Sequence, residues 1–265
     1  MIPGPNIIIK CPSCGKLHQR KSIISGNTCG AIFFSDGSRI APMLPDFPYF
    51  VKCQKSECGV YFKIIESVIA SKCDVYFNNI KSVIAGVVSR NETRDNLYMP
   101  MVSFMSFYEY LDCIDTGLFN SGKKGSREWE DDLLSLRISL WRALNIKKET
   151  IHQIIAQDLR FSIEDDEPMR KLRTKYRTPI KTVYEINCNE ILSLLDKKSD
   201  DESLLIKAEL YRNIGNFDMC ESTLKLLKEP DEYIALITAI KKACGEKIPF
   251  TVRVEEDRTY IEIRI

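Results

Sequence analysis

The chain has 265 residues, enough for one or two domains with a sizeable core, and its 44% hydrophobic and 28% charged residues are typical of a globular protein. A formal net charge of +1 excludes a strong overall field toward nucleic acid or lipid headgroups. No apolar run is long enough to span a bilayer and the first residues do not form a signal peptide, so we expect a cytoplasmic protein without a membrane partner.

Two cysteine pairs near the N-terminus form the strongest motif in the chain. Each pair is followed directly by a glycine, and the four cysteines are Cys11, Cys14, Cys53 and Cys58. Glycine allows each turn to close tightly, so that backbone N–H groups face the sulfurs. Four thiolates can surround Zn²⁺ as a tetrahedron with no open position. We therefore predict one structural Zn²⁺ and no catalysis at the metal.

Two other side chains compete as zinc ligands. Cys29 could replace one member of the more widely spaced second pair, and His18 lies four residues after Cys14. Neither has a partner at the spacing of a zinc knuckle. The other cysteines stand singly in apolar patterns, where a reduced thiol packs as a small hydrophobic group, and this favours a reducing compartment.

Residues 1–62 have the pattern of short strands and turns. Apolar strands at 7–10 and 49–52 lead into the two cysteine pairs, and residues 31–34 before a Ser-Asp-Gly turn indicate one arm of a hairpin. A strand, a knuckle, a long excursion and a second strand with its knuckle are the layout of a zinc ribbon. A module this small relies on its metal for much of its folding free energy.

Residues 63–160 are predicted to form a helical domain. Ile64, Ile65, Val68 and Ile69 recur at helical spacing, as do apolar residues at 83–88. A further helix is expected at 104–118, and after the flexible loop 121–125 a strongly amphipathic helix begins at Ser126. Its apolar face carries Trp129, Leu133, Leu136, Leu140 and Leu144, with Leu134, Ile138 and Trp141 beside it.

The last third of the chain is predicted to be a helical region at 161–248 followed by a C-terminal β-hairpin at 249–265. An acidic run precedes a basic run at 170–181, and helices are expected at 183–196, 202–214, 217–228 and 230–244. Apolar and polar residues alternate at 250–254 and again at 260–265. The predicted fold class is α+β, mainly α, with a small zinc ribbon of short antiparallel strands packed on a helical body.

Residues 204–230 resemble a single tetratricopeptide repeat. The matching positions are Ala208, Tyr211, Gly215, Phe217 and Pro230, with Cys220 where alanine is usual, while the repeat's first tryptophan is missing. The resemblance implies two antiparallel helices, and because one repeat cannot bury its own face, neighbouring helices would complete the stack. The alternative is a generic helical hairpin.

The whole chain also resembles a group of uncharacterised bacterial proteins. The shared motifs are the first knuckle at 11–15, an excursion at 25–38 with Ser-Asp-Gly, the second knuckle at 53–59 and Tyr-Arg-Asn-Ile-Gly-Asn-Phe at 211–217. This resemblance implies the architecture described above and carries no activity.

Catalytic arrangements are weak in this sequence. Only two histidines occur, and no phosphate-binding glycine loop or dinucleotide motif is present. Glu109, Asp112 and Asp115 share helix faces as paired catalytic carboxylates do, but such groups are usually solvated surface. We therefore lean against an enzyme.

Two functions remain open. The first is a non-catalytic adaptor, stabilised by zinc, that binds a partner protein through its helical region. The alternative is a nucleic-acid-binding protein that uses the ribbon and the basic segment 170–181. The candidate contacts in that segment are Arg170, Lys171, Arg173, Lys175 and Arg177, which would otherwise form a solvated face neutralised by the acidic run before it.

Overall fold

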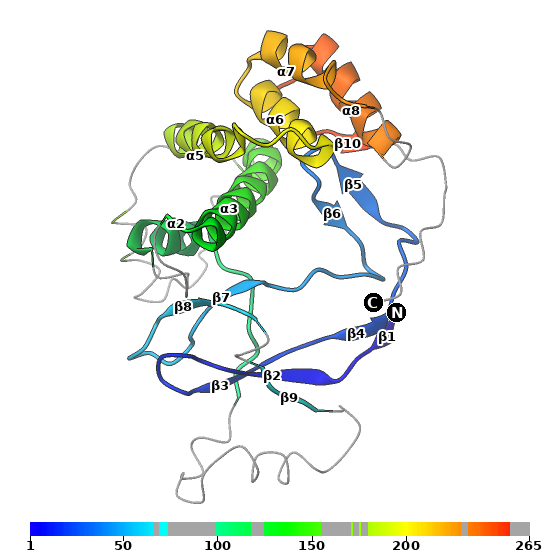
Figure 1. Cartoon of the computed structure of the whole chain (residues 1–265). Coiled ribbons are helices and arrows are strands. Elements are labelled where there is room, and N and C mark those ends of the chain that lie inside the picture. Colours follow the sequence, from blue (N-terminus) through cyan, green and yellow to red (C-terminus); the bar gives the residue numbers. More distant parts are fainter. Residues whose placement is uncertain are drawn as a thin grey trace, which may run out of the picture.

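The computed structural model describes residues 1–65, 69–73, 99–117, 125–154, 171, 175, 180–228 and 233–254. Within these residues the chain is a helix-rich α+β fold, with six helices and four small sheets (Figure 1). None of the described helices combines the length and the apolar character that crossing a bilayer requires.

The strands form two- and three-stranded sheets in which all pairings are antiparallel. The first sheet has the order β3-β2-β9 and the second joins β7 to β8; a third has the order β10-β5-β6, and β1 pairs with β4. The strands are β1 (Ile2–Pro3), β2 (Asn6–Lys10), β3 (Leu17–Arg20), β4 (Ile23–Ser25), β5 (Ile32–Phe34), β6 (Arg39–Ile40), β7 (Phe50–Lys52), β8 (Tyr61–Lys63), β9 (Ile69–Cys73) and β10 (Arg253–Val254).

The helical expectation for the segment after residue 63 is wrong in the described part. Ile64 donates its backbone N–H to Tyr49 O and so extends the β7–β8 pairing, and Ile69–Cys73 is strand β9, antiparallel to β2. A short apolar run rich in β-branched residues fits both the helical period and the strand period. Here the run forms a strand because it pairs with the edge of β2 that β3 does not occupy. Residues 66–68 and the predicted helix around 83–88 lie outside the described residues.

The other helices begin and end close to the predicted positions. They are α2 (Phe107–Thr116), α3 (Arg127–Ile154), α5 (Ile180–Leu195), α6 (Asp201–Asn213), α7 (Phe217–Leu224) and α8 (Ile234–Gly245). Ser106 caps α2 in a capping box with Glu109, and Ser126 Oγ accepts the backbone N–H of Trp129 at the start of α3. The predicted apolar face of α3 is buried from Leu133 to Leu144.

The β7–β8 hairpin connects two hydrophobic cores. Phe50 and Tyr61 pack with helices α2, α3 and α5 in the larger core. Val51 and Phe62, their neighbours in sequence, pack with β2 around Cys11 and Cys53. Because successive side chains of a strand point to opposite faces, one hairpin serves both cores, and the strand-rich module packs directly on the helical body.

Helices α6, α7 and α8 share a separate core at the other end of the molecule. Ala208, Cys220 and Ile240 are fully buried in it, and Gly215 turns the chain between α6 and α7 with a φ of +82°. Helices α6 and α7 pack against each other, and the assignment of residues 204–230 to the tetratricopeptide repeat stays a prediction. Of the C-terminal hairpin, the structure describes the first arm, which pairs as β10 with β5; the second arm lies outside the described residues.

Candidate metal centre

The four predicted cysteines meet between the two knuckles. Their sulfur atoms all lie within 4.8 Å of one another, and two sulfur contacts join different knuckles: Cys14 to Cys53 at 3.6 Å and Cys11 to Cys58 at 3.9 Å. A tetrahedron with metal–sulfur bonds of ~2.3 Å has sulfur–sulfur edges of ~3.8 Å. The geometry and the chemistry of the four donors therefore fit a tetrahedral metal ion.

The same pattern of backbone hydrogen bonds closes both knuckles. The N–H of Cys11 donates to Lys16 O at 2.9 Å, and the N–H of Cys53 donates to Val60 O at 2.8 Å, so each pair lies in a closed hairpin. Each hairpin turns through a glycine in the left-handed region, with φ of +74° and +57° at Gly15 and Gly59. A side chain at either position would strain the turn that presents the sulfurs.

The four thiols are not equivalent. Burial raises the pKa of Cys11, although the backbone N–H groups of Cys14 and Ser13 partly oppose the effect. Partial burial also acts to raise the pKa of Cys58, but the Val60 N–H and the neighbouring thiols outweigh it and lower that pKa to about 7. The cluster thus stabilises one thiolate by itself, and a divalent cation would displace the remaining protons.

The rival ligands do not join the cluster. Cys29 is exposed, and its backbone N–H donates to Asn27 Oδ1. His18 is completely buried beside the site, where its ring approaches Phe62 edge-on and burial lowers its pKa. Its ring nitrogens contact the backbone of both knuckles: Nδ1 lies 3.1 Å from Lys16 O, and Nε2 accepts the N–H of Gln54 at 3.1 Å.

The carboxylates of α2 make contacts with residues of β7 and β8 and with Lys175. Glu109 caps its own helix and lies 3.5 Å from Lys52 Nζ on β7. Asp112 accepts the Tyr61 hydroxyl at 2.9 Å and pairs with Lys175 at 2.7 Å, while Asp115 lies 3.7 Å from the same lysine. These contacts join the second knuckle's hairpin to α2.

The predicted basic segment is described at two of its five candidate positions. Lys171 and Lys175 are exposed residues, and Lys175 is held by the two aspartates of α2. Arg170, Arg173 and Arg177 lie outside the described residues. Of the two described positions, Lys175 therefore forms ion pairs with carboxylates of this chain.

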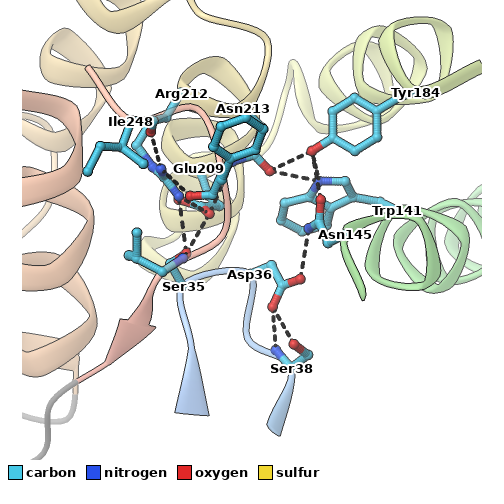
Figure 2. Close-up of polar contacts among 12 residues, drawn as sticks. Ser35, Asp36, Ser38, Trp141, Asn145, Tyr184, Glu209, Arg212, Asn213 and Ile248 are labelled. Atoms are coloured by element: carbon cyan, nitrogen blue, oxygen red, sulfur yellow. Dashed lines mark hydrogen bonds and ion pairs between the residues drawn. The ribbon is translucent and has the colours of Figure 1, made fainter. Parts of the chain in front are cut away.

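A buried polar network was not predicted from the sequence (Figure 2). Ser35, after β5, donates its hydroxyl to Glu209 Oε1 at 2.7 Å and accepts N–H groups from Arg212 and Val252. Arg212 pairs with Glu209 on the same helix and donates to the carbonyl oxygens of Ile248 and Phe250. Glu209 and Arg212 are 1% and 0% exposed, so this ion pair is fully removed from water.

The network continues toward α3 and α5. Asp36 Oδ2 accepts from Asn145 Nδ2 at 2.8 Å, and Asn145 Oδ1 accepts the hydroxyl of Tyr184 at 2.8 Å. Trp141 donates its indole N–H to Asn213 Oδ1 at 3.1 Å (Figure 2). Burial raises the pKa of Tyr184 far above its usual range, so its hydroxyl remains a hydrogen-bond donor.

The network attaches the turn between β5 and β6 to three helices and to the segment before β10. Its side chains have hydrogen-bond partners in the network or on the backbone beside it, so it holds this turn in place as a structural lock. The available signal in the sequence was the pair of motifs at 25–38 and 211–217, which contribute Ser35, Asp36, Arg212 and Asn213. Figure 1 shows the β5–β6 hairpin reaching from the strand-rich half to α6.

The chain was compared with protein-family models, with curated proteins and with solved structures. No family model, no curated protein and no solved structure matches it.

Proposed function

We propose that the chain is a non-catalytic adaptor, stabilised by a structural Zn²⁺ at Cys11, Cys14, Cys53 and Cys58, which binds a partner protein through its helical region. The observation that carries the partner-binding part is a groove of about 210 Å³ between α8 and the segment leading into β10. The zinc part rests on the convergence of four sulfurs from two knuckles. A site with four thiolates offers the metal no open position for a substrate.

The groove has small side chains in its floor, and its charged lining residues are two cations, Lys242 and Arg253, and one carboxylate, Glu246. Ala235, Ala239 and Ala243 on α8 line it, together with Lys242 and Arg253. Among the described residues, neither of these two cations makes an ion pair, and both are exposed. A partner segment that carries acidic side chains would fit this combination of small side chains and exposed cations.

The surface of helix α6 is less suited to binding a partner. The face of α6 that carries Glu209, Arg212 and Asn213 is covered by this chain's own residues Ser35 and Val252. Displacing them would break the hydrogen bonds that Ser35 makes with Glu209 and Arg212. We therefore assign partner binding to the groove on α8 and not to α6.

We expect Ala239→Trp to abolish partner capture, because an indole fills the groove. Lys241→Trp is the matched control, since Lys241 is exposed on the same helix and does not line the groove. The measurement is a nuclease-treated pull-down from the native host, with a photo-crosslinking residue in place of Lys242. A loss of at least about tenfold corresponds to ~1.4 kcal/mol of binding free energy.

The adaptor proposal requires that the wild type and Lys241→Trp capture the same protein and that Ala239→Trp does not. The captured protein should also crosslink to the photo-reactive residue at position 242. Equal capture by all three proteins would place the interface elsewhere and overturn the assignment of the groove. Nucleic acid that copurifies, and whose affinity falls steeply with salt, would instead favour the nucleic-acid-binding alternative.

A further inference from the structure

The side chain of His18 lies where the two knuckles face each other, although it is outside the cluster of sulfurs. It projects from β3, opposite Ile9 of β2, and none of its surface is exposed. One ring nitrogen contacts Lys16 O, the same carbonyl that accepts the N–H of Cys11. The other contacts the N–H of Gln54, the residue that follows Cys53. A single imidazole therefore spans from the first knuckle to the second.

The two contacts fix the tautomer of this histidine. A backbone N–H can only donate, so Nε2 must be the unprotonated acceptor for Gln54. A carbonyl can only accept, so Nδ1 must carry the proton that it donates to Lys16. The neutral ring satisfies both contacts at 3.1 Å.

We propose that His18 is a positioning residue for the metal centre, which sets the separation of the two knuckles and hence the size of the sulfur tetrahedron. This inference rests on the proposed Zn²⁺ site and deepens it. The Cys14–Cys53 and Cys11–Cys58 sulfur contacts both run between the knuckles, so a change in knuckle separation alters these edges of the tetrahedron directly. Groups that orient metal ligands from outside the coordination shell typically contribute about 10–100-fold to metal affinity.

The test compares three substitutions in the full chain, loaded with Co²⁺ as a spectroscopic substitute for Zn²⁺. His18→Leu removes both hydrogen bonds and keeps an apolar side chain of similar reach. His18→Gln retains an acceptor for the Gln54 N–H and loses the donor to Lys16. Val102→Ala is the control, because Val102 packs in the same core as Cys11 and Cys53 and its side chain cannot form a hydrogen bond.

We expect His18→Leu to weaken Co²⁺ and Zn²⁺ binding by about 10–100-fold and to change the visible absorption band of tetrahedral Co²⁺. His18→Gln should recover part of the affinity, and Val102→Ala should lower stability while leaving the cobalt spectrum unchanged. Wild-type affinity and an unchanged spectrum in His18→Leu would overturn the role of His18. A wild-type chain that binds neither ion would overturn the metal site itself, so the two failures are distinguishable.

Discussion

Replacing Cys53 by serine, or removing the metal with a chelator, is expected to lower the free energy of unfolding of the whole chain by more than about 4 kcal/mol. The first reason is the binding free energy of the metal, which stabilises only the folded site. Structural zinc contributes about 10–16 kcal/mol of apparent binding free energy in small zinc-finger peptides. A larger chain retains its other cores, so the loss of stability here should be smaller.

The second reason is the β7–β8 hairpin, which carries Cys53 at one end and packs on both cores. Phe50 and Tyr61 belong to the core of the helical body, and Tyr61 also bonds to Asp112 of α2. A hairpin that loses its knuckle no longer holds these side chains in place. We therefore expect the helical body to unfold at a lower temperature as well.

The two tryptophans make this effect measurable. Trp129 and Trp141 are the only tryptophans in the sequence, and both lie on α3. Their fluorescence therefore reports the helical body and not the metal centre. Cys29→Ser is the matched control, because Cys29 is exposed and lies outside the sulfur cluster. A tryptophan transition that is the same with and without metal would show that the two halves fold independently.

Replacing Arg212 by leucine should destabilise the chain by about 3–5 kcal/mol, because it leaves Glu209 as an uncompensated buried charge. The substitution also removes the donor for the carbonyl oxygens of Ile248 and Phe250. Glu209→Leu should cost a similar amount. The double variant should be less unstable than the sum of the two, since it buries no unpaired charge, but the two carbonyl groups remain without their donor.

The exposed pair of Glu221 and Lys225 on α7 is the control for this cycle. Its side chains are 65% and 71% exposed, so its loss should cost about 0–1 kcal/mol. Chemical denaturation of the four proteins in each cycle gives the coupling energies. A cost below about 1 kcal/mol for Arg212→Leu would mean that water reaches the pair and that the network is not a lock.

The features that the sequence predicted well are local. Each knuckle and each described helix depends on the spacing of residues that are close in sequence. The cysteines of the knuckles and the apolar faces of the helices can therefore be recognised in the sequence. Strand β9 was missed because it pairs with β2, and the residues of β2 lie far earlier in the chain. Short apolar runs do not distinguish a buried strand from a helix.

The buried network could not be derived because its partners are far apart in the chain. Ser35 and Glu209 are separated by 174 residues, and Ser35 and Val252 by 217. The sequence around Ser35 indicates only a turn, and Arg212 sits in a helix where an arginine is ordinarily solvated. Only the fold brings these residues together and removes them from water. His18 was considered as a ligand, and the structure places it against the backbone beside the ligands.

The central claim is that four cysteines from two knuckles hold one structural metal ion, and X-ray absorption spectroscopy of the purified full chain tests it most directly. Together with elemental analysis, it should show about one zinc per chain, bound by four sulfur atoms at ~2.3 Å. Cys29→Ser should leave this result unchanged. Protein purified without chelators that contains no zinc, or zinc bound by nitrogen or oxygen in place of any of the four sulfurs, would contradict the account.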